Sequence, residues 1–483
     1  MGLRKNMISN LILTSSNILF PLLTFPYITH VLSNDSYGRI SFIDAFTSYF
    51  LTFATIGIPF YGIREIAKVK DDPQQYSKLV IELAGFQLCL SLFFSVVFLV
   101  MQFYVPAIHS NFGLVKIACI VIISSSFSID WFFQGTENFG YITKRSLFTK
   151  LLNVISIFLF VKAATDHNIY YLISALTILI NSAWNFIYFL RRFYRPFTGR
   201  LTIKPHLKSL LVLFSINISI SVYTVLDTII LGLFTDPTTV SLYTVPLKLV
   251  KMFWTVVGSI GVVLIPKIAY LFVRDDQQAI TDLIKKSSNI VFLLTIPFAG
   301  FCLVFPHEIL VVIAGDKYLR TVGALQILSV VPLIIGFCNV LGSQFLLPIG
   351  QEKKILHATI VGLVVSLALN FSLIPYLKHL GAALACVAAE TAVCLYIFFS
   401  AKKRTKIVLD SSLLTLIGIS LLVSLGFGIL VQEKLHSLVL LVTTAGMYVV
   451  TFASLHLLVF KNPFLNSLID VKKFKFMKVR QSS

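Results

Sequence analysis

The sequence predicts an all-α polytopic membrane protein in which fourteen transmembrane helices make up most of the chain. Of the 483 residues, 57% are hydrophobic and only 13% are charged. An ordinary soluble domain has about 25% charged residues. Apolar segments of at least about 17 residues also recur from one end of the sequence to the other. The chain therefore has too little polar surface for a water-soluble globule.

Each predicted span is long enough to cross about 30 Å of hydrocarbon at about 1.5 Å per residue. Pro21, Pro26 and Pro59 fall inside or at the end of the first two spans, where neighbouring helices of a bundle satisfy the freed carbonyls. We expect flexible bends at these prolines. The predicted spans are 6–32, 39–60, 76–104, 116–133, 146–164, 169–190, 209–234, 241–265, 288–305, 323–347, 358–374, 381–400, 411–430 and 437–460.

The distribution of basic residues predicts the orientation. A net charge of +19 would suit a nucleic-acid partner, but the basic residues lie between the spans, which is the membrane topology signal, so no nucleic acid is expected. With the amino terminus inside, cytoplasmic segments carry 31 of the 40 Lys and Arg, external segments carry seven, and two lie within a span. Both termini are therefore predicted in the cytoplasm. The first apolar stretch is too long for a signal peptide and is expected to stay as an anchor.

The two halves of the sequence resemble each other. The hairpin at 6–67 aligns with 209–274, so that Pro59 corresponds to Pro266. Weak repeats of this kind are typical of transporters built from two six-helix lobes. Because six is even, both repeats start on the same side of the membrane. We expect two pseudo-symmetric six-helix lobes at 1–200 and 201–410, two C-terminal helices at 411–460, and a basic cytoplasmic tail at 461–483.

Motifs for enzymatic chemistry are absent from the sequence. The six cysteines all lie in apolar segments without a CxxC spacing, and His307-Glu308 is not followed by the second histidine of a zinc helix. No glycine-rich phosphate loop is present, and no predicted external loop exceeds about seventeen residues. We expect no catalytic residue, metal or cofactor. A polymerase or ligase with a large outward domain is disfavoured.

The clearest functional candidates are Lys248 and Lys251 in the eighth predicted span. Three residues apart, they share a helix face, and a cation at the bilayer centre costs roughly 2.5–3.5 kcal/mol unless it is paired or hydrated. One interpretation is a structural ion pair with Asp227, which lies at a similar depth in the seventh span. The other is a water-filled cavity in which the lysines bind an anion, and we favour it because Lys251 has no evident carboxylate of its own.

Charged residues near the second span form a further set. Arg39 opens that span and either lines the cavity or extends to the outer headgroups, while Asp44 lies a turn deeper. Arg64 and Glu65, at the inner end, either anchor the helix at the membrane surface or gate the cytoplasmic mouth.

Carboxylates at membrane depth are candidates for ion coupling. Asp130 and Glu82 lie near the inner surface, and Glu390 lies close to mid-membrane in the twelfth span. A desolvated carboxyl at that depth binds and releases a proton. The alternative is a hydrogen-bonded packing contact between helices.

The amino-terminal motifs resemble those of a known family. The run LFPLLTFPYITHVL, followed by SYGRISF and GIPFYGIREIAKVKDDP, is similar to the signature of the bacterial oligosaccharide-lipid flippases of O-antigen and capsule pathways, the Wzx type. These belong to the multidrug/oligosaccharidyl-lipid/polysaccharide exporter superfamily. The local resemblance covers about the first 75 residues; beyond them it rests on the count and spacing of helices.

The resemblance implies a substrate and partners. It implies a flippase that moves a polyprenyl-diphosphate-linked oligosaccharide to the outer leaflet, in contact with membrane lipids. Because the sequence has no nucleotide-binding motif, we expect the drive to be an ion gradient, of protons or sodium ions, or the concentration of the lipid-linked substrate, and we favour proton antiport. The polymerase of the same pathway is a candidate partner. Polar side chains that would line a chamber for the sugar are Ser215, Asn217, Ser219, Ser221 and Asn339. The alternatives are a cation-coupled multidrug exporter of the same superfamily, a peptidoglycan-precursor flippase, or a membrane enzyme of polysaccharide assembly.

Overall fold

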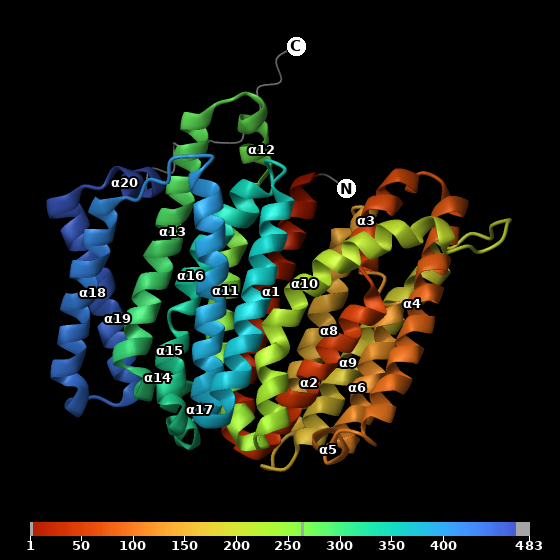
Figure 1. Ribbon diagram of the computed structural model, residues 1–483, viewed down its shortest axis with the longest axis horizontal. Helices are drawn as coiled ribbons and strands as arrows, with labels where there is room; N and C mark the ends of the chain where they lie inside the picture. The colour runs from red at the N-terminus through yellow and green to blue at the C-terminus, as the bar shows by residue number, and fades with distance from the viewer. Residues whose placement is uncertain (1–2, 262–264, 470–483) are drawn as a thin grey trace. The chain divides into compact units, whose positions relative to one another are not determined.

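The computed structural model confirms that the chain is all-helical. It describes residues 3–261 and 265–469, and over these ranges the regular elements are helices, with no strand (Figure 1). Ten stretches of the described residues are long and apolar enough to cross a membrane. The predicted chamber residues Ser215, Asn217, Ser219 and Ser221 lie outside the positions whose side chains are described.

The chain divides into two compact units. The first contains Met1–Lys248, Ile313–Ala324 and Thr359–Ala389. Within it α2 packs against α4, α6 and α10, α1 packs against α8, and α8 packs against α9. Its elements are α1 (Leu3–Val31), α2 (Asn34–Thr55), α3 (Ile58–Val69), α4 (Pro73–Met101), α5 (Pro106–His109), α6 (Phe112–Ser124), η1 (Ser125–Phe127), α7 (Asp130–Gly135), α8 (Phe139–Phe160), α9 (His167–Arg192), α10 (Lys204–Phe234), most of η3 (Asp316–Thr321), and parts of α11 and α17.

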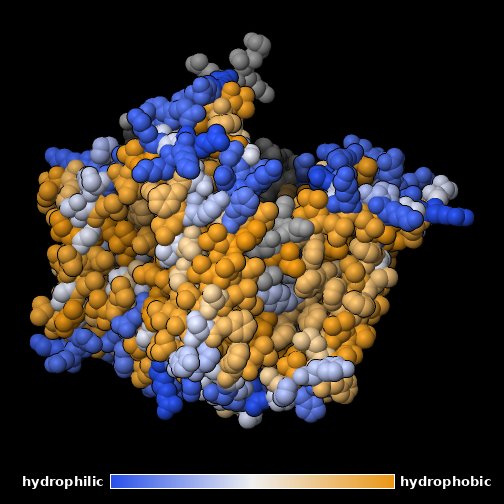
Figure 2. Space-filling view, viewed as in Figure 1, coloured by the Kyte–Doolittle hydropathy of each residue, from blue (hydrophilic) through white to orange (hydrophobic). Residues whose placement is uncertain are grey.

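The second unit contains Leu249–Val312, Leu325–Ala358 and Glu390–Ser483. Within it α13 packs against α16 and α18, and α18 packs against α19. Hydrophobic residues cover the sides of α13 and α18, while hydrophilic residues gather at α20 and the turn between α12 and α13 (Figure 2). Its elements include α12 (Ile265–Val273), α13 (Gln277–Val304), α14 (Pro306–Ile313), α15 (Val322–Leu328), α16 (Val331–Asn339), the π-helix η4 (Val340–Leu346), α18 (Ser411–Val431), η5 (Gln432–Lys434), α19 (Ser437–Leu455), η6 (His456–Phe460) and α20 (Pro463–Ile469).

Four of the described helices contribute residues to both units. The unit boundary crosses α11 (Pro237–Gly261) after Lys248 and crosses α17 (Glu352–Lys402) after Ala389. It also divides α15 after Ala324 and separates the last residue of α14, Ile313, from the rest of that helix. The 51 residues of α17 are two helices joined at a kink, where Lys378 has a positive φ of 50° three residues after Pro375. This kink separates the predicted spans 358–374 and 381–400.

Among the differences between the helix boundaries and the predicted spans, two bear on the site. The predicted span 39–60 is split into α2 and α3, because Ile56 and Gly57 adopt left-handed φ values of 42° and 81° just before Pro59. The fifth span was predicted from residue 146, whereas α8 begins at Phe139 and includes three basic residues. Those charges exclude α8 from the ten apolar stretches. The count of fourteen spans and the lobe boundaries stay predictions.

The order and length of the helices repeat along the chain. Helices α1, α2 and α3 have 29, 22 and 12 residues, and α10, α11 and α12 have 31, 25 and 9. In each set two long helices are followed by a short one, which is the order that the alignment of 6–67 with 209–274 predicts.

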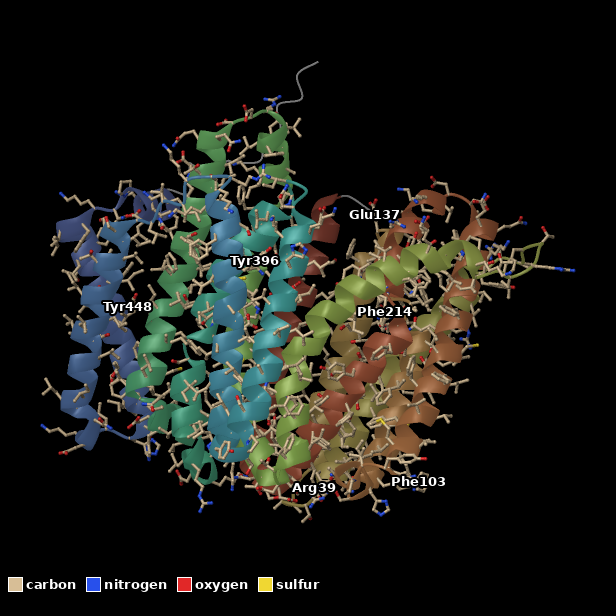
Figure 3. The ribbon with its side chains drawn as sticks, in the orientation of Figure 1. Arg39, Phe103, Glu137, Phe214, Tyr396 and Tyr448 are labelled. Carbon is tan, nitrogen blue, oxygen red and sulfur yellow. The ribbon has the colours of Figure 1, made fainter. Side chains whose placement is uncertain are left out.

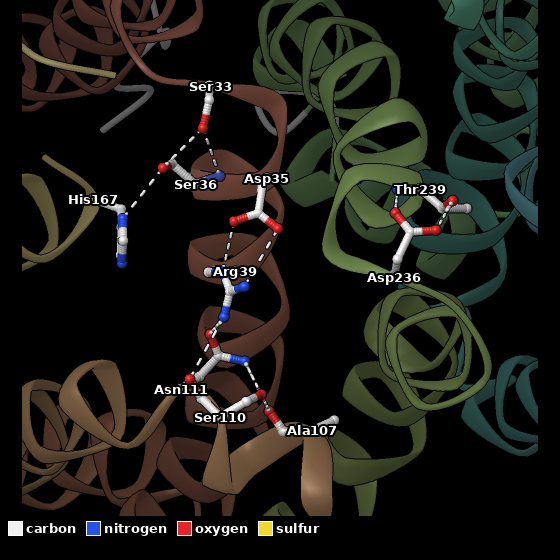
Figure 4. A network of polar contacts seen from close by, with 10 residues as sticks. All are labelled: Ser33, Asp35, Ser36, Arg39, Ala107, Ser110, Asn111, His167, Asp236 and Thr239. Atoms are coloured by element: carbon white, nitrogen blue, oxygen red, sulfur yellow. Dashed lines mark hydrogen bonds and ion pairs between the residues drawn. The ribbon is translucent and has the colours of Figure 1, made fainter. Parts of the chain in front are cut away.

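Side-chain caps fix the starts of the helices that carry the candidate site. The Ser33 hydroxyl accepts a hydrogen bond from the Ser36 backbone N–H at the start of α2, at 3.1 Å. At the start of α11 the Asp236 carboxylate accepts from the Thr239 backbone N–H and hydroxyl, at 2.9 and 2.8 Å (Figure 4). Burial of Asp236 acts to raise its pKa, but these hydrogen bonds outweigh it and hold the pKa below its usual value. The carboxylate therefore stays charged at the positive end of α11.

Gly38 provides a test of helix packing in the first unit. A Cβ added at Gly38 in α2 would overlap the backbone carbonyl of Pro237, whereas a Cβ at Gly85 in α4 would meet nothing within 4 Å. We expect Gly38→Ala to destabilise the protein by roughly 1–3 kcal/mol, because the backbones must separate. Gly85→Ala is the matched control and should be neutral or slightly stabilising. Thermal unfolding in detergent measures both, and equal midpoints would contradict the close packing.

Candidate functional site

Lys248 lies between aromatic rings in the first unit. Its ammonium is 5.2 Å from the ring centre of Phe25 in α1 and 5.8 Å from that of Tyr37 in α2. It also interacts electrostatically with the Tyr37 hydroxyl and with Tyr170 of α9. Cation–π contacts contribute from about 0.5 to 2 kcal/mol, more when the cation is desolvated. The rings therefore hold Lys248 in place while neutralising only part of its charge.

Asp44 is the acidic group near Lys248. The two side chains interact electrostatically, but no carboxylate of the described residues lies within ion-pair distance of Lys248. The Asp44 side chain is exposed. A charged side chain within a membrane span usually faces the interior of the bundle or a water-filled cavity. Lys248 itself is partly exposed.

Lys251 belongs to the other unit. The unit boundary falls between it and Lys248 on α11, and its side chain is exposed. The helix places the two lysines one turn apart on one face, as the sequence predicts.

Asp227 lies in a buried polar cluster of the first unit. Its carboxylate accepts hydrogen bonds from Tyr243 of α11 at 2.9 Å, Ser366 at 3.1 Å and Asn370 at 2.6 Å, the last two from α17. Only 5% of Asp227 is exposed. These three donors orient the carboxylate inside the first unit. Such a group is suited to bind a proton or another small cation.

Asp130 has a cationic partner. It forms an ion pair with Arg145 of α8 and accepts a hydrogen bond from Asn185 of α9 at 3.0 Å. The Arg145 side chain is only 1% exposed and also donates to Asn181 at 3.0 Å. The network joins α7, α8 and α9, and this charge compensation favours a structural role for Asp130 over ion coupling.

Arg39 is held in a polar network at one end of the first unit. Its guanidinium pairs with Asp35 at 2.6 Å and donates to the Asn111 side chain at 3.2 Å (Figure 4). Arg39 and Phe103 lie at the end of this unit opposite to Glu137 (Figure 3). Arg39 also lines a cavity of about 290 Å³ with Asn111. The structure thus gives Arg39 an environment separate from the aromatic contacts of Lys248.

The remaining predicted residues lie elsewhere. Arg64 and Lys68 both pair with Glu65 at 2.9 Å on α3, where the basic partners are exposed. Glu390 is buried in the second unit, on α17, and interacts electrostatically with Cys338 and Cys394. Within the described residues no three His, Cys, Asp or Glu side chains are grouped so that they could hold a metal ion.

Several residues of the site are not evident from the sequence. Phe25, Tyr37 and Tyr170 surround Lys248, but they are ordinary members of a chain with 43 Phe and 18 Tyr. Ser366 and Asn370 contact Asp227 from more than 130 residues away. Their spacing of four places both on one helix face, which is the only sequence signal for them.

Two family models match the chain. One, described as "Polysaccharide biosynthesis protein", covers residues 3–272, and the other, "Lipid II flippase MurJ", covers residues 143–457. A curated "Putative O-antigen transporter" from Escherichia coli (strain K12) is 26% identical over 408 residues, covering 81% of this chain and 95% of the relative. One of the same description from Shigella dysenteriae is 23% identical over 412 residues, covering 83% and 100%.

Solved structures share the fold. The lipid II flippase MurJ in an inward closed conformation aligns with a TM-score of 0.69 at 15% identity, covering 96% of this chain and 99% of that one. An inward-facing multidrug resistance transporter of the MATE family aligns with a TM-score of 0.61 at 15% identity, covering 80% and 94%. At such identities the likeness concerns the fold alone.

Two carboxylates on the first unit should respond differently to neutralisation. We expect Asp130→Asn to lower the free energy of unfolding by about 2–3 kcal/mol, because it leaves the buried Arg145 guanidinium uncompensated. Asp44→Asn, the matched control, removes an exposed carboxylate with no ion pair and should change stability by less than about 0.5 kcal/mol. Thermal unfolding of the purified variants tests this, and an unchanged Asp130→Asn midpoint would rule out the structural role.

Proposed function

The chain belongs to the polysaccharide biosynthesis protein family, as a Wzx-type member of the multidrug/oligosaccharidyl-lipid/polysaccharide exporter superfamily, and from that premise we propose a flippase for a polyprenyl-diphosphate-linked oligosaccharide. The substrate would cross the bacterial cytoplasmic membrane for the synthesis of O-antigen or another surface polysaccharide. The family match, the similarity to proteins described as O-antigen transporters and the flippase-like fold support this.

The environment of Lys248 carries the proposal. A diphosphate is multiply charged and cannot enter hydrocarbon without groups that replace its water. Lys248 presents a cation that aromatic rings position and no close carboxylate neutralises. The accessible Asp44 nearby supports a hydrated space beside it. We assign Lys248, with Lys251 as a further cation, to a cationic cavity that binds the diphosphate. Arg39, which is paired with Asp35 in a separate environment, is the weakest of the three predicted cations for this role.

Translocation would proceed by alternating access. The sugar would occupy the hydrated cavity, while the polyprenyl tail stays in the bilayer between the two predicted six-helix lobes. The break at Ile56–Gly57 and the kink at Lys378 are suitable bending points, because helical hydrogen bonding is interrupted there. Arg64 and Glu65, next to the first break, would form the cytoplasmic gate.

Coupling to an ion gradient is the second part of the proposal. Asp227 is the foremost candidate, since its carboxylate is buried and hydrogen bonds from α11 and α17 hold it in place. Asp44 and Glu390 remain candidates as well, and the pairing of Asp130 with Arg145 makes it the weakest. We favour a proton over sodium, moved in antiport.

The same proposal places the protein in its cellular setting. The ten apolar stretches and the family match make it a multi-pass membrane protein. We propose the bacterial cytoplasmic membrane, with both termini in the cytoplasm, as its site. Membrane lipids and the polymerase of the pathway are the proposed partners.

Charge removal at Lys248 tests the cavity. We expect Lys248→Gln to reduce surface polysaccharide roughly 10- to 100-fold in cells without the native flippase, since a charge-assisted hydrogen bond contributes about 1.5–3 kcal/mol. Lys251→Gln should give a smaller loss. The exposed Lys353 provides the control Lys353→Gln, which should support full output. Wild-type amounts of surface polysaccharide from both Lys248→Gln and Lys251→Gln, at normal protein levels, would exclude the proposed anion site.

Neutralisation of Asp227 tests the coupling. We expect Asp227→Asn in proteoliposomes to retain substrate binding but to abolish the acceleration of transport by an imposed proton gradient. The reason is that the amide keeps the hydrogen-bonded shape and cannot carry the charge. A sodium gradient applied to the wild type distinguishes the two ions. Transport by Asp227→Asn that still responds to either gradient would exclude Asp227 from coupling.

A further inference from the structure

A second cation lies inside the first unit, away from Lys248. The ammonium of Lys150 in α8 donates hydrogen bonds to two side chains of α1, the Ser16 hydroxyl at 2.9 Å and the Asn17 amide oxygen. Both acceptors are neutral. Among the described residues no carboxylate lies within ion-pair distance of Lys150. Because an ammonium has three N–H donors, one donor is left for a further ligand.

The depth of Lys150 makes its charge significant. It is twelfth of the 22 residues of α8, and Asn17 is fifteenth of the 29 residues of α1. At about 1.5 Å per residue, Lys150 lies about 15 Å from either end of α8. A four-carbon stem does not reach a membrane surface from there. From the sequence Lys150 counted with the cytoplasmic charges, because the predicted span began only at residue 146.

Two polar side chains of α1 are exposed at this level. Ser15 and Asn17 are exposed midway along the helix, next to exposed Ile12 and Leu19, and Ser16 between them is buried. Hydrocarbon cannot satisfy an exposed amide. The Asn17 amide therefore requires water or a polar ligand beside it.

Lys150 of α8 and Lys248 of α11 contact α1 at two different positions along its axis. Lys150 contacts α1 at Asn17, and Lys248 contacts it at Phe25. The eight residues between them correspond to about 12 Å along the axis. With the amino terminus of α1 at the cytoplasmic end, a substrate that enters from the cytoplasm would reach Lys150 before Lys248.

We propose that Lys150, held by Ser16 and Asn17, is a second anion-binding site that receives the diphosphate of the lipid-linked substrate before it reaches Lys248. This inference rests on the proposed flippase function and adds an entry step to it. The ammonium neutralises one charge of the diphosphate while Ser15 and Asn17 hydrogen-bond its oxygens. Anionic phospholipid headgroups share the phosphate chemistry, so the experiment must separate the two sources.

The experiment measures binding of farnesyl diphosphate to the full-length protein in phosphatidylcholine nanodiscs, with farnesol as the tail-only probe. Lys150→Gln removes the charge but keeps a hydrogen-bonding side chain, and Lys150→Arg keeps the charge. Asn153→Ala, three residues along α8, is the matched control, because it removes a neutral hydrogen bond to Thr177 of 3.0 Å. Thermal unfolding confirms that each variant is folded.

We expect Lys150→Gln to raise the Kd for farnesyl diphosphate at least about tenfold, with Lys150→Arg and Asn153→Ala near the wild type. Asn17→Ala, which keeps the charge and releases the ammonium, should give a smaller rise and serves if Lys150→Gln does not fold. This inference alone would be overturned if Lys150→Gln bound farnesyl diphosphate as tightly as the wild type while Lys248→Gln bound it more weakly. If Lys150→Gln does not fold, the same comparison is made with Asn17→Ala. Wild-type protein that binds farnesyl diphosphate no better than farnesol would overturn the proposed function as well. Equal displacement by phosphatidylglycerol, lost in Lys150→Gln, would reassign the site to a phospholipid headgroup.

Discussion

The structure depends on one constraint, which is the cost of placing charge where hydrocarbon would otherwise be. A cation at the centre of a membrane costs several kcal/mol unless it is paired, hydrated or bound. The first unit compensates its interior charges in different ways. Arg145 is paired with Asp130, whereas Lys248 and Lys150 are held by aromatic rings and neutral polar groups. The ion pair is suited to stabilise the fold, and we propose that the two lysines bind an anion.

The helices around these charges are arranged to keep them in position. Close packing at Gly38 brings α2 against the start of α11, and the Asp236 cap fixes that start. Tyr37 lies one residue before Gly38 and contacts Lys248 on α11. Two neighbouring residues of the SYGRISF motif therefore have different roles, because Gly38 allows the close helix packing and Tyr37 lies beside Lys248.

The sequence predicts the fold class and the principal cation for a clear reason. An isolated lysine in an apolar span is conspicuous, and so is a run of such spans with basic residues between them. The aromatic partners of Lys248 could not be predicted, because they come from helices that only the tertiary fold brings together. The break of α2 was expected at Pro59, but a left-handed isoleucine, Ile56, has no sequence signal. The sequence does not single out Lys150, because it places Lys150 near the start of the predicted span 146–164, whereas α8 begins at Phe139 and has Lys150 near its middle.

The central claim is that the Lys248 ammonium contacts the phosphate of the substrate. Solid-state NMR on protein with ¹⁵N-labelled lysine side chains, bound to a short-chain polyprenyl diphosphate in lipid bilayers, measures this through the dipolar coupling between ¹⁵N and ³¹P. The account predicts a coupling that corresponds to direct hydrogen bonding and whose signal disappears in Lys248→Arg. A bound diphosphate with no coupling to the Lys248 nitrogen would contradict it.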